Sequence, residues 1–401
     1  MGKRLRRLLL GSALPALLCW VSLAHAAPAK DPIKIGFMAP FVGVYTQLGI
    51  DMERGFKLYL EEIGYKAGGR QITVVTEDTE GKPELGPTKA RKLIDNDKVS
   101  LLAGIVHSGV AMSVREIVTE QKIPLIITNA GAPELTAAKK SPYIFRVSFA
   151  NGQQDLAGGW YAYNKLGYKR MVIIAPDYSA GHDKADGFMK YFKESGGKIV
   201  EEMYPPLTTN DFGPYLTKIA DRAKEVDAVW SFFSGSGSIR LITQYQEYGL
   251  KDAIPLFVIG DTIDDSVLPS MKDAAIGVKS YHQYADAVKN PENEKFVKAY
   301  RAKYKVNPGT FSEQGYVGAK VIAMAIEAVK GNVENREAFA AAMRKIKFNA
   351  PRGPFAFDEN QNVILPVYIR RTDKIGGQLQ HVILDSIPNV DQNWTPAKLK
   401  K

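Results

Sequence analysis

Residues 101–127 read LLAGIVHSGVAMSVREIVTEQKIPLII and contain the repeating unit that decides the fold. The apolar run at 101–105 predicts a buried strand, and residues 110–120 have the spacing of an amphipathic helix. Residues 125–127 are a second buried strand. A strand, a helix and a second strand in this order predict parallel pairing, with the helix crossing over one face of the sheet.

The same alternation continues on both sides of this unit. Toward the N-terminus, residues 33–38 and 72–77 are expected strands, with a helix expected at 49–63. Near residue 150 it restarts, with strands at 170–175, 198–203, 228–232 and 255–259 and helices at 152–166, 183–195, 214–223 and 238–248. Near the C-terminus we expect helices at 293–304, 314–329 and 336–345, a stiff turn at 351–354 and a strand at 363–371. The sequence therefore predicts an α/β protein with two doubly wound parallel-sheet lobes and a cleft.

Residues 1–26 have the three parts of a removable export signal. A cluster of basic residues within 3–7 precedes an uncharged apolar run at 8–23, and Ala24-His25-Ala26 matches a signal-peptidase site. The alternative is a membrane anchor, but the run is shorter than the ~20 residues that a transmembrane helix needs. We therefore expect cleavage before Ala27 and a mature protein that acts outside the cytoplasm.

Composition argues against several kinds of site. The only cysteine, Cys19, lies in the export signal, so disulfides, thiolate metal sites and cysteine nucleophiles are not expected. Without the four N-terminal cations, 49 of the 53 Lys and Arg residues remain against 43 acids, a net charge of +6. These cations are dispersed, which argues against nucleic-acid binding, and the scattered histidines match no zinc motif. We therefore expect no metal and no cofactor.

Several stretches resemble the periplasmic leucine/isoleucine/valine-binding proteins, the solute-binding components of ABC importers. These stretches are 33–39, 45–55, 101–108, 126–136, 211–212, 244–250 and 353–358. The family fold has two α/β lobes joined by a hinge of three crossings, and the ligand is trapped between them. The resemblance implies that 31–149 and 281–353 form lobe one and that 150–280 and 354–391 form lobe two. It also implies a membrane permease as partner, and we expect a monomer.

The loops after the lobe-one strands supply candidate ligand-binding residues, because ligands bind at the carboxyl ends of parallel strands. His107 and Ser108 precede a helix, where a hydroxyl and free backbone N–H groups suit a carboxylate. Capping the helix is the other role open to Ser108, but the resemblance implies that it grips the ligand carboxylate. By the same resemblance, Asn129, Ala130 and Gly131 contribute to the ligand site.

Lobe two contributes two loops with aromatic and small residues. Tyr178 and Ser179 lie between a strand and a helix, although the Tyr of the resembled family falls two positions later, at Ala180. Residues 232–238 (FFSGSGS) lack the Lys and the spacing of a phosphate-binding loop. We expect Phe232 or Phe233 to form a wall of the pocket. The resemblance places Ser234 where the amino-acid binders have Tyr, so the smaller Ser234 is expected to enlarge the pocket.

Asp261 and Thr262 follow the last strand of lobe two and bear on the charge of the ligand. In the branched-chain amino-acid binders that the sequence resembles, an acid at the position of Thr262 pairs with the ligand's α-ammonium. Thr is uncharged, and Asp261 is expected to face another side because neighbours after a strand alternate. A buried ammonium without a counter-charge is strongly unfavourable. We therefore expect a carboxylate ligand that has no ammonium group.

Aromatic residues at strand ends, among them Tyr45 as a lip over the ligand, suit a planar solute. Further stretches resemble the branch of this family that serves aromatic-acid uptake: 178–187, 196–198, 210–212, 274–277 and 351–358. The predicted ligand is accordingly an aromatic acid such as a benzoate or a hydroxycinnamate, captured by hinge closure.

Other functions are open to a chain of this kind. One alternative is binding of a branched-chain amino acid, another amino acid or an amide for uptake, and another is a ligand-sensing receptor of the same fold. An enzyme is not expected, because adjacent residues such as His107 and Ser108 rarely form a nucleophile–base contact and no G-x-S-x-G elbow is present.

Overall fold

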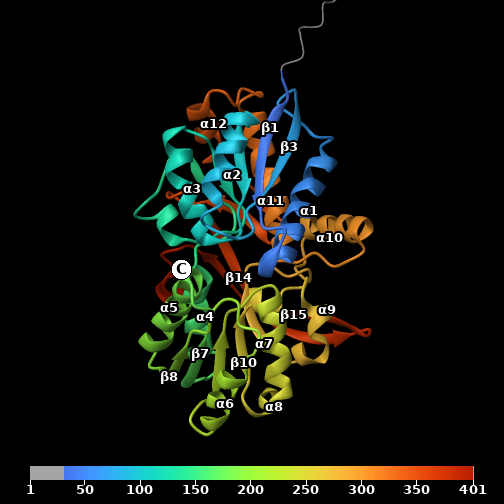
Figure 1. Cartoon of the computed structure of the whole chain (residues 1–401). Coiled ribbons are helices and arrows are strands. Elements are labelled where there is room, and N and C mark those ends of the chain that lie inside the picture. Colours follow the sequence, from blue (N-terminus) through green and yellow to red (C-terminus); the bar gives the residue numbers. More distant parts are fainter. Residues whose placement is uncertain (1–30, 401) are drawn as a thin grey trace, which may run out of the picture. The chain divides into compact units, whose positions relative to one another are not determined.

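The computed structural model describes residues 31–400, and the predicted export signal at 1–26 lies outside the described residues. From Pro32 onward the chain forms one compact unit. Two sheets organise this unit into two α/β lobes, and helices cover both faces of each sheet (Figure 1). The fold class expected from the sequence is confirmed.

The first sheet has the strand order β2-β3-β1-β4-β5-β6. Its strands are β1 (Ile33–Ala39), β2 (Lys66–Ala67), β3 (Arg70–Asp78), β4 (Leu101–Gly104), β5 (Leu125–Ile127) and β6 (Ile144–Arg146). Neighbouring strands are parallel except β2 and β3, which are antiparallel. The carboxyl ends of β4, β5 and β6 therefore meet at one edge, as the strand–helix–strand unit predicts.

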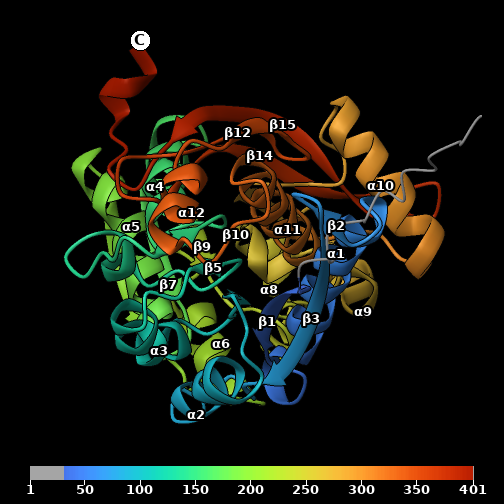
Figure 2. The same cartoon turned by 90° about the horizontal axis from the view of Figure 1, so that it is seen from above.

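The second sheet has the order β12-β13-β14-β11-β10-β9-β7-β8, and β15 pairs with β14. Its strands are β7 (Arg170–Ile174), β8 (Lys198–Met203), β9 (Ala228–Ser231), β10 (Leu256–Ile259), β11 (Lys279–His282), β12 (Lys347–Ala350), β13 (Gly353–Phe357), β14 (Val363–Ile375) and β15 (Gln378–Val390). Strands β8, β7, β9, β10 and β11 are parallel, whereas β14 pairs with β11 antiparallel. The long hairpin of β14 and β15 thus extends a parallel sheet (Figure 2).

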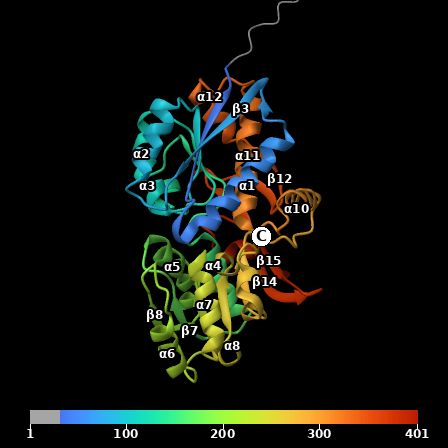
Figure 3. The same cartoon turned by 45° about the vertical axis from the view of Figure 1, so that its right-hand side comes forward.

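Helices pack in pairs on the sheets. In lobe one, α1 packs against α11, and α3 lies on the opposite face of the sheet together with α2. In lobe two, α4 packs against α5 (Figure 3). The helices are α1 (Thr46–Glu62), α2 (Gly86–Arg91), α3 (Ser108–Glu120), α4 (Gln153–Asn164), α5 (Ser179–Glu194), α6 (Gly213–Asp221), α7 (Ser236–Glu247), α8 (Leu250–Ala253), α9 (Leu268–Met271), α10 (Pro291–Tyr304), α11 (Thr310–Ala328) and α12 (Arg336–Met343).

The central strands are apolar throughout because both of their faces are buried. Phe37 of β1 belongs to the core beneath α1, where its ring centroid lies 5.0 Å from that of Phe56. Met38, the next residue, belongs to the core beneath α3, with Val110 and Val114. This alternation explains why the strands appear in the sequence as short continuous apolar runs.

Buried polar contacts tie the segments that pass between the sheets. Gln153 Nε2, at the start of α4, donates to the carbonyl oxygen of Val363 at 2.9 Å. Arg352 and Glu313 form an ion pair in which both side chains are fully buried. Arg352 Nη1 also donates to the Val147 carbonyl oxygen at 2.9 Å. These contacts lie beside the predicted crossings near 150 and 353, whereas the lobe boundaries predicted from the sequence stay predictions.

The C-terminal hairpin was only partly predictable from the sequence. The strand expected at 363–371 continues to Ile375, and β15 was not expected at all. Gly376 and Gly377, with φ of 58° and 81°, form the turn between the two strands. The stiff turn predicted at 351–354 connects β12 to β13, which pair antiparallel.

Candidate ligand-binding site

Loops that follow strands of both sheets surround a small cavity. The loops after β4, β5 and β6 reach it from one sheet, and those after β7, β9 and β10 reach it from the other. Its lining consists of Tyr45, Leu48, Val106, His107, Ser108, Asn129, Gly131, Phe149, Asn151, Tyr178, Ala180, Lys184, Phe232, Ser234, Asp261 and Phe311. This is the place where open parallel sheets bind ligands.

The cavity has a volume of about 30 Å³. Pockets for organic ligands usually measure ~300–1,000 Å³, whereas ~10–15 Å³ accommodates one water molecule. The facing side chains or the two lobes must therefore move apart before an organic solute can enter.

Most of the predicted site residues line this cavity, namely Tyr45, His107, Ser108, Asn129, Gly131, Tyr178, Phe232, Ser234 and Asp261. Ala130 does not line the cavity. It is fully buried, and its N–H donates to the Ile105 carbonyl oxygen at 2.9 Å. Ser179 is exposed at the first position of α5. Thr262 Oγ1 accepts the Phe233 N–H at 3.0 Å and lies outside the lining. Contact between these residues and a ligand stays a prediction.

The start of α3 forms the lobe-one wall. His107 is the N-cap residue, and its Nδ1 accepts the Gly109 N–H at 3.1 Å. Burial lowers the pKa of His107, so its ring is uncharged near neutral pH. Ser108 is 3% exposed, and its Oγ accepts from Asn151 Nδ2 at 3.3 Å. Because His107 caps the helix, the Ser108 hydroxyl is available as part of an uncharged donor set suited to a carboxylate.

The loop after β5 approaches this wall closely. Asn129 is buried, and its Nδ2 donates to Gln314 Oε1 at 2.8 Å. The Gly131 carbonyl oxygen accepts the Asn151 N–H at 2.7 Å. A Cβ at position 131 would lie 2.1 Å from Asn151 Oδ1 and 3.0 Å from Asn151 N, so a larger residue would displace the Asn151 side chain. The polar groups of the loop are therefore positioned by Asn151 and Gln314, neither of which the sequence analysis identified.

Aromatic rings from both lobes meet in the cavity. The Tyr178 ring lies between His107 and Phe232, with centroid separations of 5.3 and 6.4 Å. Tyr178 thus reaches the cavity although the resembled family has its Tyr two positions later. The Tyr45 hydroxyl is buried and has no hydrogen-bond partner among the described residues, and burial raises the pKa of Tyr45 to about 12. These rings offer flat apolar surfaces on which a planar solute can stack.

A buried ion pair forms the charged part of the lobe-two wall. Lys184 of α5 and Asp261 are 2% and 3% exposed, and Lys184 Nζ lies 3.3 Å from Asp261 Oδ2. The same Nζ lies 4.2 Å from the ring centroid of Phe149 and 4.9 Å from that of Phe232. Burial alone would raise the pKa of Asp261, but the attraction of Lys184 outweighs burial and lowers it. Asp261 is therefore a charged carboxylate.

The position of Asp261 corrects the geometry inferred from the sequence. Strand alternation was the reason to place Asp261 on another side, but β10 ends at Ile259 and a 3-10 turn follows at Gly260–Ile263. Alternation does not apply within this turn, and Asp261 rather than Thr262 faces the cavity. The site thus contains an acid, and Lys184 already pairs with it.

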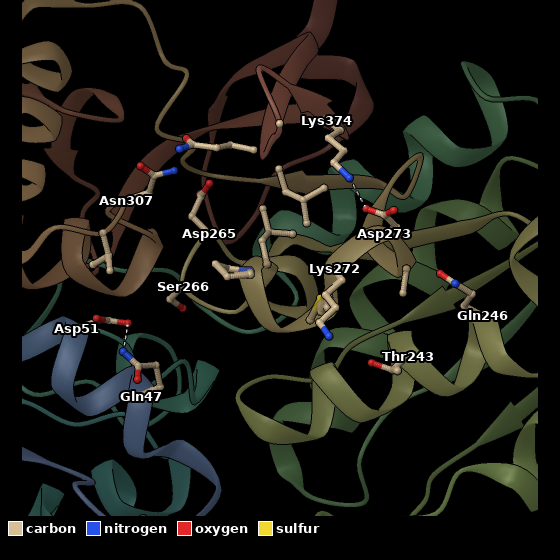
Figure 4. Close-up of a pocket in the computed structure, with 18 of the residues that line it drawn as sticks. Gln47, Asp51, Thr243, Gln246, Asp265, Ser266, Lys272, Asp273, Asn307 and Lys374 are labelled. Atoms are coloured by element: carbon tan, nitrogen blue, oxygen red, sulfur yellow. Dashed lines mark hydrogen bonds and ion pairs between the residues drawn. The ribbon is translucent and has the colours of Figure 1, made fainter.

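A larger groove of about 1,120 Å³ lies elsewhere on the molecule (Figure 4). Its lining comes from α1, α7, residues 265–274 and 305–307, and the β14–β15 hairpin. Side chains there pair with one another: Gln47 Nε2 donates to Asp51 at 3.0 Å, and Lys374 Nζ donates to Asp273 at 2.9 Å. Among the described residues, none from the loops directly after β4, β5, β7 and β9 lines this groove. We therefore place the candidate site in the smaller cavity.

The family model of the periplasmic binding proteins matches residues 32–377. The chain belongs to the periplasmic binding protein family. This family consists of ligand-binding proteins, and its type I fold agrees with the two α/β lobes described above. The family resemblance expected from the sequence is confirmed.

Relatives of this periplasmic binding protein are similar over nearly their whole length. Leu/Ile/Val-binding protein homolog 6 of Brucella melitensis is 33% identical over 369 residues, which cover 90% of this chain and 93% of that protein. The structure of an ABC transporter substrate-binding protein from Sphaerobacter thermophilus is 42% identical, with a TM-score of 0.86 and coverage of 90% and 99%. A solute-binding protein of an ABC transporter from R. palustris, in complex with benzoate, is 36% identical, with a TM-score of 0.85 and coverage of 90% and 98%. The last structure confirms the resemblance to the aromatic-acid branch.

Several lining residues of this periplasmic binding protein were missed in the sequence, and Lys184 is the most consequential. Ala180, Lys184 and Phe188 are spaced four residues apart on one face of α5, and all three are buried. A lysine within the apolar stripe of an amphipathic helix was the available signal. Asn151 and Phe149 lie between β6 and α4, in no helix or strand, so no periodic pattern distinguished them in the sequence.

In the part of the chain that the structure describes, no helix has the length and apolar character that crossing a bilayer requires. Within residues 31–400, no group of three or more His, Cys, Asp or Glu side chains is arranged to hold a metal ion.

Proposed function

We propose that this protein is the solute-binding component of an ABC importer and captures a small aromatic carboxylate in the periplasm. The observation that carries the proposal is the composition of the cavity. Uncharged donors at Ser108 and the start of α3 face aromatic rings, while Lys184 balances the charge of Asp261. The 36% identity to the protein solved with benzoate supports the same ligand class.

In this proposal the ligand carboxylate docks on lobe one. Ser108 and the backbone of residues 129–131 bind its oxygens, and His107 holds the start of α3 in place. The aromatic ring of the ligand lies against Tyr178 and Phe232, whose ring centroids are 6.4 Å apart and whose planes are inclined by 28°. Tyr45 covers the ligand, and Ser234 leaves room for it. The remaining predicted residues, Ala130, Ser179 and Thr262, act on the ligand only through the lining residues beside them.

Capture proceeds by hinge closure. A volume of about 30 Å³ is that of a cavity whose walls have closed on each other. Separation of the lobes at the predicted crossings near 150, 280 and 353 opens the cavity, and ligand shifts the equilibrium back through its contacts with both walls. The closed protein, acting as a monomer after removal of residues 1–26, presents both lobes to a membrane permease.

A thermal-shift series on the purified protein tests this function. A ligand that binds the folded state raises the melting temperature according to its concentration and affinity. We expect benzoate and coumarate to raise it and leucine to leave it unchanged. A shift with leucine and none with either aromatic acid would overturn the proposal.

Amino-acid uptake is the second candidate, and the 33% identity to a Leu/Ile/Val-binding protein homolog favours it. It requires a free carboxylate for the ligand's α-ammonium, and Asp261 would have to leave Lys184 to provide one. The same thermal-shift series separates the two candidate functions. Amino-acid uptake predicts a higher melting temperature with leucine, whereas uptake of aromatic acids predicts one with benzoate and coumarate.

A further inference from the structure

The candidate cavity contains one pair of opposite charges. Among the described residues that line it, Asp261 is the only carboxylate and Lys184 the only ammonium group. Their charged atoms lie 3.3 Å apart, and both side chains are almost completely buried. Charges withdrawn from water in this way are stable only when paired. The pair therefore leaves the cavity with no net charge of its own.

Lys184 Nζ occupies the place that an amine ligand would need. It lies beside Asp261 and within 4.2 and 4.9 Å of the ring centroids of Phe149 and Phe232. A carboxylate flanked by aromatic faces is the environment that recognises organic ammonium groups. Because the protein's own ammonium group already fills this environment, an incoming amine finds no free counter-charge there.

Arg370 is a buried cation that also attracts Asp261. It is attracted more strongly by Asp265 and Asp264 and does not line the cavity, so it does not replace Lys184. His282 Nε2 lies 3.6 Å from Asp261 Oδ1, and His282 does not line the cavity. Burial lowers the pKa of His282, so its ring is uncharged near neutral pH. Without Lys184, the cavity would therefore hold an unpaired negative charge, which repels carboxylates and attracts ammonium groups.

We propose that Lys184 is the specificity-determining residue of this site: it serves as a built-in ammonium group that neutralises Asp261 and reserves the cavity for carboxylates that carry no amino group. This inference rests on the proposed function and extends it by assigning the discrimination between acids and amino acids to one side chain on α5. The acid that an amino-acid binder requires is present as Asp261, but it already forms an ion pair with Lys184.

Isothermal titration calorimetry near neutral pH with benzoate and benzylamine tests the inference, because these probes share a ring and differ in the sign of their charge. Lys184→Met keeps a long side chain and removes the charge. It is expected to weaken benzoate at least ~10-fold and to create measurable benzylamine binding. Asp261→Asn releases Lys184 toward the ligand and is expected to tighten benzoate binding at least ~10-fold.

Two further variants complete the experiment. Lys184→Met combined with Asp261→Asn leaves no charge in the cavity, so it should bind benzoate with an affinity between those of the single variants and should not bind benzylamine. Lys190→Met is the matched control, because Lys190 is an exposed lysine on the same helix that pairs with Glu194. It should bind both probes as the unmodified protein does.

The outcomes separate this inference from the function on which it rests. One outcome is that the unmodified protein binds benzoate while Lys184→Met keeps the same preference for benzoate over benzylamine. That result would overturn the inference and leave the proposed function standing. If Lys184→Met does not fold, Asp261→Asn decides, and an unchanged or weaker affinity for benzoate overturns the inference. Binding of leucine and not of benzoate by the unmodified protein would overturn the proposed function and this inference together.

Discussion

The two walls of the ligand cavity differ in how they are built. The lobe-one wall uses uncharged groups from single strand-end loops, such as Ser108 at the start of α3 and Gly131 after β5. The lobe-two wall uses a charged pair, Lys184 and Asp261, whose members lie 77 residues apart in the sequence. In the proposed function, the first wall provides a docking place for a carboxylate, and the second determines which other charges the ligand can carry.

The largest expected effect follows from breaking the charged wall. Lys184→Met should lower the free energy of unfolding by about 3–5 kcal/mol, because Asp261 would remain buried without its cation. Adding Asp261→Asn should recover most of this loss, since no isolated charge then remains. Chemical denaturation of the ligand-free variants measures both values, with Lys190→Met as the exposed control. Equal stability of Lys184→Met and Lys190→Met would show that the pair contributes nothing to the lobe-two wall.

The uncharged wall is tested by Ser108→Ala. Loss of a buried hydroxyl that bonds the ligand should weaken benzoate binding by about 1–3 kcal/mol. Ser179→Ala is the control, because Ser179 is exposed and lies outside the cavity lining. Titration calorimetry of both variants gives the comparison. Equal affinities would assign Ser108 a structural role through its contact with Asn151.

A second buried aspartate, Asp155, lies outside the cavity lining and contrasts with Asp261. Asp155 of α4 accepts from the Tyr281 hydroxyl at 2.5 Å, and burial raises its pKa to about 6 despite the attraction of Lys184. The folded state therefore holds this proton more tightly than the unfolded state. The resulting stabilisation is complete below the unfolded pKa of ~3.9 and is lost as the pH rises through about 6.

Because the pKa of Asp155 is higher in the folded than in the unfolded state, its protonation stabilises the folded protein as the pH falls. Between about pH 7 and pH 5, the unfolding free energy of the unmodified protein should rise by about 1 kcal/mol relative to Asp155→Asn. Denaturation curves at a series of pH values measure the difference. The buried histidines are present in both proteins, so their opposing contribution to the pH dependence cancels in the comparison. Parallel pH profiles for the two proteins would mean that Asp155 is charged in the fold, as Asp261 is.

The smallest expected effect concerns the ring that covers the cavity. The Tyr45 hydroxyl is buried without a hydrogen-bond partner among the described residues. Tyr45→Phe should therefore raise the unfolding free energy of the ligand-free protein by up to about 1 kcal/mol. Tyr245→Phe is the matched control, because its hydroxyl donates to the Ile254 carbonyl oxygen at 2.9 Å and its loss should destabilise the protein. Destabilisation by Tyr45→Phe would instead indicate that its hydroxyl is bonded in the ligand-free state.

The fold and the lobe-one wall were predictable because their signals are local. The apolar runs at β4 and β5 and the helix between them are visible in fewer than thirty consecutive residues, and strand ends in a parallel sheet meet by necessity. The predicted direction of the Asp261 side chain was wrong, because strand alternation does not apply beyond the end of a strand. Strand alternation placed Asp261 on the wrong side because a 3-10 turn begins directly after β10.

The sequence by itself determined two doubly wound lobes, the family, and the loops that reach the candidate ligand cavity, because apolar periodicity and strand-end chemistry act over short stretches of chain. The tertiary structure alone decided the charge of that cavity. Lys184 looks like one more lysine on an amphipathic helix until packing buries it 3.3 Å from Asp261. Desolvation then makes each charge depend on the other, and no local pattern records that dependence.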